Sequence, residues 1–68
     1  MTEATINWIS GPVLRAATRD AFRLSDAVFA GPEQFLGEVI RVDDEGIVAQ
    51  IYEDTTGLRP GNAVRGAG

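Results

Sequence analysis

The side chains that most often perform enzyme chemistry are scarce in this sequence of 68 residues. It has no Cys and no His, so a thiolate nucleophile, an imidazole base and the commonest metal ligand are missing. All six basic residues are Arg, whereas a phosphate-binding loop of the Walker type needs a Lys that reaches the phosphates. Ser10 and Ser25 have no imidazole to activate them. We therefore expect no catalytic, cofactor-binding or metal-binding residue in this chain, and no nucleotide site.

The densest group of carboxylates is the run Asp43–Glu45, which Gly46 follows. Such a run could suggest a calcium loop, but it lacks the alternating ligand spacing of an EF-hand. Turns favour Asp and Gly for reasons of backbone geometry alone. The run therefore predicts a solvated turn rather than a metal site.

The stretch Glu53–Gly61 has the most distinctive local chemistry. Pro60 and Gly61 fit the two central positions of a type II turn, and Gly57 also permits a positive φ. One interpretation is a rigid, exposed connector that contacts a neighbour. The other is an ordinary loop that leads into a last short strand at Asn62–Val64. The local residues leave both interpretations open.

The overall charge argues against nucleic-acid binding. Six basic and ten acidic residues give a net charge of −4, whereas binding to phosphates requires clustered positive charge. We expect the aromatic residues to pack in the core or at a subunit interface. These are Trp8, Phe22, Phe29, Phe35 and Tyr52. The sequence has no apolar run of the roughly 20 residues that a membrane span needs and no signal-peptide pattern at its start, so we expect a soluble, intracellular protein.

Short segments rich in Val, Ile and aromatic residues alternate with Gly and Pro, which is typical of strands. The predicted strands are Thr5–Ser10, Pro12–Ala16, Asp26–Ala30, Glu38–Val42, Ile47–Tyr52 and Asn62–Val64. The fourth and fifth segments predict a hairpin around Asp43–Gly46. Its period-2 pattern predicts that one set of side chains points inward and that Val48, Gln50 and Tyr52 point outward. The inward set is Ile40, Val42, Ile47, Ala49 and Ile51.

The middle of the chain supports two predictions. Apolar residues at spacings of three and four form a helical stripe that predicts a helix over about Val13–Val28. The stripe consists of Leu14, Ala17, Ala21, Leu24 and Val28. The same region, bounded by Pro12 and Gly31, could equally hold two short strands and a loop.

Two segments, Leu36–Arg41 and Gln50–Gly61, resemble the start of the catalytic A subunit of V/A-type ATPases (ATP synthases). That family carries a Gly-Glu-(Ile/Val)-Ile strand and then a Gln-Val-Tyr-Glu-x-Thr-x-Gly-Leu-x-x-Gly segment. Ile9–Val13 is similar to the family's opening Val-x-Gly-Pro-(Val/Leu), and Asp26–Gly31 lies where the family has its third strand. Tyr52 favours the A subunit over the B subunit, which usually has Phe there.

The resemblance implies an all-β fold, a small six-stranded antiparallel β-barrel, rather than a helix in the middle of the chain. Residues 1–68 would then be a single N-terminal domain, truncated from a larger ATPase subunit that synthesises or hydrolyses ATP and moves protons or sodium ions. Such barrels form a crown on the alternating A/B hexamer, so the implied partners are the barrels of neighbouring B subunits. The implied location is cytoplasmic and peripheral, with no direct membrane contact and no nucleic acid. No catalytic residue of the family has a counterpart in this chain.

The alternative is a free-standing small β-barrel that binds a peptide or an oligonucleotide, because small barrels host many functions. A concentrated basic and aromatic face would favour that alternative, and the linear sequence contains no such cluster. An enzyme is disfavoured by the missing site chemistry. We expect the isolated chain to be a monomer.

Overall fold

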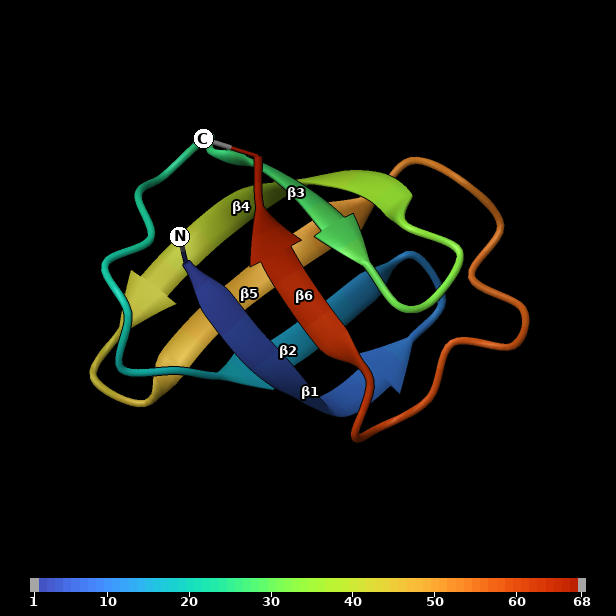
Figure 1. Cartoon of the computed structure of the whole chain (residues 1–68), viewed down its shortest axis with the longest axis horizontal. Coiled ribbons are helices and arrows are strands. Elements are labelled where there is room, and N and C mark those ends of the chain that lie inside the picture. The colour runs from blue at the N-terminus through green and yellow to red at the C-terminus, as the bar shows by residue number, and fades with distance from the viewer. Residues whose placement is uncertain (1, 68) are drawn as a thin grey trace.

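The computed structural model describes residues 2–67, which form six strands joined by turns and loops (Figure 1). The strands are β1 (Glu3–Ser10), β2 (Val13–Ala17), β3 (Ala27–Ala30), β4 (Phe35–Asp43), β5 (Gly46–Ile51) and β6 (Ala63–Gly66). They close into a barrel in the order β1-β2-β5-β4-β3-β6, and every neighbouring pair is antiparallel. The prediction of an all-β, six-stranded antiparallel barrel is confirmed. Closure gives every strand two hydrogen-bonded neighbours, so this sheet has no open edge.

The β4–β5 hairpin is confirmed with its turn where the sequence predicts it. Asp43 pairs with Gly46, which leaves Asp44 and Glu45 as the turn residues. The Asp43 carboxylate accepts hydrogen bonds from the backbone N–H groups of Glu45 at 2.9 Å and Gly46 at 3.1 Å. A side chain at Gly46 would overlap the carbonyl oxygen of Ala16 on β2, so this position requires Gly.

The core consists of inward-facing strand residues and two side chains supplied by loops. The buried apolar residues are Ala4, Ile6, Leu14, Ala16, Phe22, Val28, Ala30, Val39, Ile47, Ala49, Ile51, Leu58 and Val64. Phe22 comes from the β2–β3 loop, and Leu58 comes from the β5–β6 loop. A Cβ at Gly66 would contact Phe22, whereas one at Gly31 would overlap Leu58. Phe22 therefore packs near the end of β6, and Leu58 packs just after β3. The two loops thus extend the apolar core beyond the residues that the strands supply.

The helix that the apolar stripe predicts over Val13–Val28 does not form. The region contains β2, a loop and β3, so its alternative of two short strands and a loop is the correct one. Leu14 and Val28 are fully buried, but Leu24 between them is 64% exposed. The residues of the stripe therefore do not all face the core. The strand pairing of the closed barrel overrides the weak helical periodicity of this segment.

Two β-bulges interrupt the alternation of inward and outward side chains. In β1 the register passes from Ile6 opposite Ala16 to Trp8 opposite Arg15, which leaves Asn7 as the extra residue. In β4 it passes from Val39 opposite Ala49 to Arg41 opposite Val48, which leaves Ile40 as the extra residue. A bulge of this kind shifts all later side chains by one position.

The prediction of the inward set is consequently correct for β5 and wrong for β4. Ile47, Ala49 and Ile51 are buried, whereas Ile40 and Val42 are each 45% exposed. Val39 takes the inward position because the bulge falls after it. The bulge does not account for Val42, which lies opposite the buried Ile47 beside the hairpin turn and is nevertheless exposed.

The loop from Tyr52 to Asn62 is fastened to the barrel at several points. Gly61 N–H donates to the carbonyl of Ile6, and the Thr55 hydroxyl donates to the carbonyl of Gly11. Asn62 N–H donates to the carbonyl of Arg59 across Pro60 and Gly61, which has φ 97°. This geometry fits the predicted type II turn. Within residues 2–67 the structure contains no helix that is long and apolar enough to cross a membrane.

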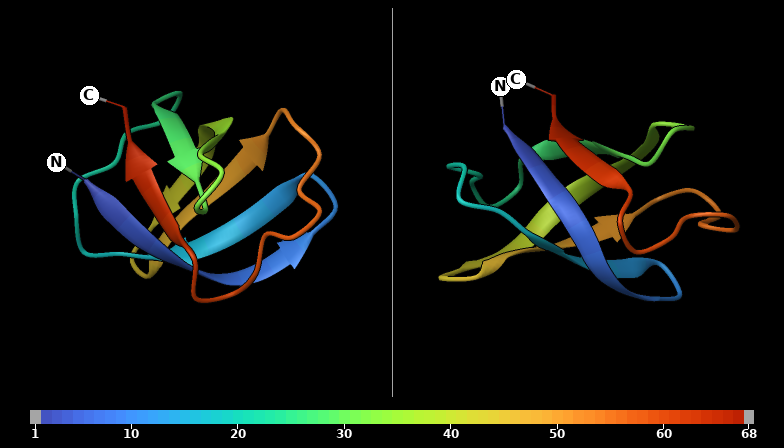
Figure 2. Two further views of the ribbon diagram at one scale, coloured as in Figure 1. Left: turned by 45° about the vertical axis from the view of Figure 1, so that its right-hand side comes forward. Right: turned by 60° about the horizontal axis from the view of Figure 1, so that its bottom comes forward.

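The first and last strands lie side by side, so the chain enters and leaves the barrel at one place (Figure 2). Glu3 is opposite Arg65, and Gly66 N–H donates to the carbonyl of Thr2 at 2.9 Å.

Candidate protein interface

One outer row of side chains crosses four neighbouring strands of the barrel. Trp8 on β1 lies opposite Arg15 on β2, Arg15 lies opposite Val48 on β5, and Val48 lies opposite Arg41 on β4. Directly opposite residues have Cβ atoms about 4.5–5.5 Å apart on the same side of a sheet. Trp8 is 48% exposed, both Arg residues are exposed and Val48 is half-buried. We call these four residues the Trp8 row.

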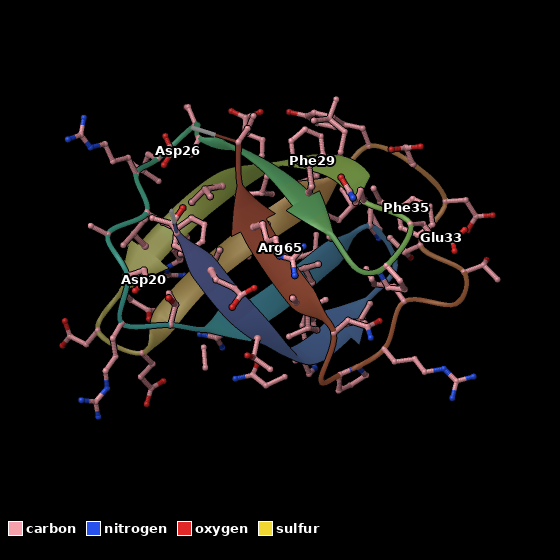
Figure 3. The ribbon with its side chains drawn as sticks, in the orientation of Figure 1. Asp20, Asp26, Phe29, Glu33, Phe35 and Arg65 are labelled. Carbon is pink, nitrogen blue, oxygen red and sulfur yellow. The ribbon has the colours of Figure 1, made fainter. Side chains whose placement is uncertain are left out.

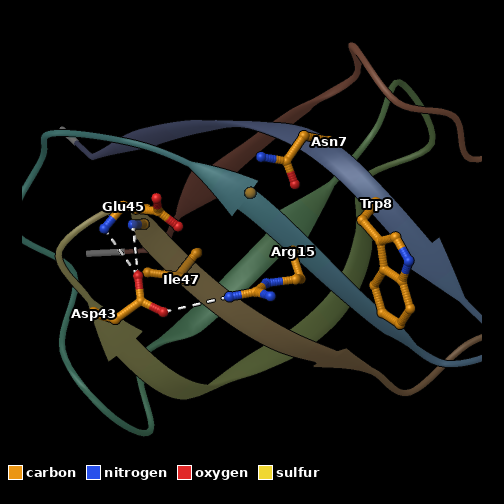
Figure 4. A pocket seen from close by; sticks show the side chains of 8 residues that line it. Asn7, Trp8, Arg15, Asp43, Glu45 and Ile47 are labelled. Atoms are coloured by element: carbon orange, nitrogen blue, oxygen red, sulfur yellow. Dashed lines mark hydrogen bonds and ion pairs between the residues drawn. The ribbon is translucent and has the colours of Figure 1, made fainter.

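Trp8 and Arg15, two of the four row residues, line a hollow of about 500 Å³ (Figure 4). Arg15 Nη2 lies 3.5 Å from Asp43 Oδ2 within it, and Asn7 and Glu45 line it as well. The pKa of the Asp43 carboxyl is held below its ordinary value, chiefly by the Glu45 N–H hydrogen bond. The Gly46 N–H and the nearby Arg15 and Arg41 guanidinium groups act in the same direction.

A second hollow, of about 520 Å³, lies over β3 and β6. Figure 3 shows Arg65 on the near side of β6 and Phe29 on β3, and both line this hollow. Arg65 Nε donates to Glu3 Oε2 at 3.1 Å, so its charge is already partnered within the chain. The barrel thus has two differently built outer sides.

The end of β5 is tied to β4 by two carboxylates. The Tyr52 hydroxyl donates to Glu38, and this hydrogen bond to a carboxylate raises the pKa of the Tyr52 phenol. Leu36 N–H donates to Glu53 Oε2 at 2.7 Å. These contacts give Tyr52 and Glu53, in the segment that resembles the family most closely, a role in holding the fold.

The carboxylate run Asp43–Glu45 forms a turn, as the sequence predicts. Within residues 2–67 no group of three or more His, Cys, Asp or Glu residues is arranged to hold a metal ion. Ser10 ends β1 and Ser25 lies in the β2–β3 loop. The sequence gives no signal for the Trp8 row, because its members come from four separate strands and depend on two bulges.

Comparison with known proteins places nearly the whole chain in one family. Residues 6–68 match the ATP synthase alpha/beta family, beta-barrel domain. The chain is 43% identical over 67 residues to A subunit 1 of the A-type ATP synthase of Methanospirillum hungatei, covering 98% of this chain and 11% of the relative. It is 48% identical over 63 residues to the A subunit of the A-type ATP synthase of Pyrobaculum aerophilum, covering 93% of this chain and 10% of the relative.

A similar relation holds for the A subunit of the A-type ATP synthase of Haloquadratum walsbyi, at 41% identity over 66 residues. That match covers 97% of this chain and 11% of the relative. The chain therefore spans about a tenth of the length of the curated relatives it matches. The barrel topology and the match over residues 6–68 agree, and the chain belongs to the ATP synthase alpha/beta family, whose beta-barrel domain it forms.

Proposed function

We propose that this barrel is the N-terminal, non-catalytic assembly domain in the A subunit of a rotary A-type ATP synthase. In this role it stabilises a ring of alternating A and B subunits as part of a crown of barrels. The observation that carries the proposal is the match of nearly the whole chain to A-subunit relatives of which it spans only about a tenth. A closed barrel has no open sheet edge, so it joins neighbours through outer side chains.

The remaining activities of the complex belong to the rest of the proposed subunit. Domains outside this barrel would bind the nucleotide and synthesise or hydrolyse ATP, coupled to the movement of protons or sodium ions. The barrel itself would lie on the cytoplasmic side, at the periphery of the complex and away from the lipid.

The proposal is tested by mixing the full-length A subunit, or the same protein without residues 1–68, with the B subunit. Native mass spectrometry reports the A/B hexamer directly. We expect the hexamer with the intact protein and only smaller complexes with the shortened one. Nucleotide binding by the shortened protein is the control for its folding. Hexamers of equal abundance in the two mixtures would contradict an assembly role.

We also expect the 68-residue chain to bind no nucleotide, because it has no Lys and no Gly-rich phosphate loop. Isothermal titration calorimetry with Mg-ATP at about millimolar concentration, the upper range of typical substrate affinities, should give no binding heat. A saturable signal with one ligand per chain would refute the non-catalytic assignment.

A further inference from the structure

We propose that the Trp8 row is the face on which the barrel of the neighbouring B subunit docks. On this proposal the B barrel presents carboxylates to Arg15 and Arg41 and an apolar side chain to Trp8 and Val48. The inference rests on the proposed assembly function and specifies which side of the barrel performs it.

The first argument is that each of the two bulges changes the direction in which one residue of this row faces. Regular alternation after the buried residues Ile6 and Val39 would turn Trp8 and Arg41 toward the core. Instead, the extra residues Asn7 and Ile40 shift the register, so Trp8 faces out opposite Arg15 and Arg41 faces out opposite Val48. Bulges commonly re-aim a side chain in this way. Two independent bulges thus bring an aromatic ring and a guanidinium group onto one outer row.

Charge is the second argument. The chain carries a net charge of −4, yet the row concentrates two of its six Arg residues and no carboxylate. Among residues 2–67, Arg41 has no carboxylate within ion-pair distance, and Arg15 has only the 3.5 Å contact with Asp43, whose side chain is 36% exposed. By contrast, Arg65 on the other side is bound to Glu3 at 3.1 Å. Arg41 can therefore still pair with a carboxylate of another chain, as can the loop residues Arg19, Arg23 and Arg59. Of these four, only Arg41 lies on a strand, where Val48 separates it from a second guanidinium group, that of Arg15.

The residue types and their surroundings indicate a protein partner. Trp and Arg are enriched among the residues that dominate binding energy at protein interfaces. A polyanion such as single-stranded nucleic acid fits poorly, because Asp43 and Glu45 at the hairpin tip line the same hollow as Arg15. A folded neighbour can place carboxylates over the row and keep them away from the tip.

The size of the face sets the strength of the contact. Three strand spacings of about 4.8 Å make the row about 14 Å long. A standard interface takes about 800 Å² from each partner, and this is nearly a fifth of the 4371 Å² that this small chain exposes. We therefore expect weak binding by the isolated chain, which is best followed by nuclear magnetic resonance.

The test titrates the ¹⁵N-labelled 68-residue chain with full-length B subunit of the same organism. Trp8 is the sole Trp, so its indole N–H gives one resolved signal from the centre of the proposed contact. We expect this signal and the amide signals of Arg15, Val48 and Arg41 to shift or broaden first. The variant Arg15→Glu/Arg41→Glu should weaken binding at least about tenfold, since it places like charges against the partner's carboxylates.

The matched control is Arg23→Glu/Arg59→Glu, which has the same net charge and changes two exposed loop residues instead. Salt at physiological concentration screens charges that lie far from the contact, so this control should bind B with an affinity within about threefold of that of the unmodified chain. Trp8→Ala should weaken binding about thirtyfold, the usual threshold of a dominant interface residue.

Each other result overturns the inference in a distinguishable way. If B binds but the shifts map to Phe29 and Arg65, or if both double variants behave alike, the face is wrong and the assembly function stands. If B does not bind even at millimolar concentration, the proposed function fails and the inference fails with it. If the signals of the Trp8 row shift as the chain's own concentration rises, and not with B, the face binds a second copy of this chain. If they shift with an oligo-dT strand and not with B, the face binds nucleic acid.

Discussion

Neighbouring residues of β5 have opposite surroundings. Ile51 is 2% exposed and Ala49 is fully buried, whereas Val48 is half-buried on the outer surface and Gln50 is exposed. Each inward side chain therefore fills core volume that no other residue can supply in so small a domain. The outward side chains do not fill this volume.

The first prediction compares two truncations in this strand. Ile51→Ala should lower the free energy of unfolding by about 2–5 kcal/mol, because it removes buried methylene groups and leaves a cavity. Val48→Ala should cost clearly less, because its side chain is only half-buried. Urea denaturation followed by circular dichroism measures both. Equal losses would mean that the register of β5 is wrong, since a slip of one residue exchanges the faces.

The second prediction concerns Asp43. The pKa of this carboxyl is lowered in the folded state, so its charge stabilises the fold above the unfolded-state pKa of about 3.9. That contribution is lost as the pH falls through the lower, folded-state pKa. The gap in unfolding free energy between the unmodified chain and Asp43→Asn should therefore be widest near neutral pH and should close in acid.

Urea denaturation between pH 7 and pH 2 measures this gap. Asp44→Asn is the control, because no hydrogen-bond donor within residues 2–67 contacts the Asp44 carboxyl. A gap for Asp43→Asn that stays constant with pH would show that the Asp43 charge contributes nothing to the turn.

At the scale of elements, the β4–β5 hairpin combines a tight turn with a close approach to β2. Gly46 faces the backbone of Ala16 so closely that no side chain fits between them. The turn and the β2–β5 pairing therefore depend on the same residue.

The third prediction is that Gly46→Ala destabilises the barrel by at least about 1–3 kcal/mol, the usual cost of forcing an extra group into a packed site. Gly11→Ala is the comparison. Gly11 also has a positive φ, of 57°, but its missing Cβ would meet open space, so only the backbone cost of about 1–2 kcal/mol applies. Thermal unfolding of the two variants should rank Gly46→Ala as the less stable. The reverse order would contradict the close approach.

The sequence allows the hairpin to be predicted because its turn residues and its period-2 pattern are adjacent in the chain. It does not predict the bulges, since the extra residues Asn7 and Ile40 are defined only by what lies across the sheet. The helical stripe is misleading for the same reason: Leu14 and Val28 face the core from two strands that are not neighbours in the barrel. The family resemblance, rather than local propensity, predicts the barrel. The Trp8 row needs both bulges and three strand pairings, so no linear pattern contains it.

At the scale of the whole molecule, closure and size act together. The barrel has no open strand to recruit another copy, which removes the commonest route to aggregation of β proteins. Copies at −4 each also repel one another at low salt. Its limited surface leaves only a small contact area on each side.

The fourth prediction is that the 68-residue chain is a monomer at micromolar concentration. Sedimentation equilibrium over a hundredfold range of concentration should fit the monomer mass of 7.3 kDa, with at most weak association at the upper end. A tight hexamer of this chain alone at micromolar concentration would indicate a self-sufficient ring and would contradict a partnership with B subunits.

The side-by-side position of the first and last strands governs how the barrel responds to force. Tension applied between Glu3 and Arg65 would break the hydrogen bonds of the β1–β6 pairing one after another. The opening would begin at the Glu3–Arg65 pair and proceed toward the pair of Thr5 and Ala63. A load that presses on the sides of the barrel is instead shared by all six strand pairings at once. The fold is therefore mechanically anisotropic: it is soft when its ends are drawn apart and stiff when its flanks are compressed.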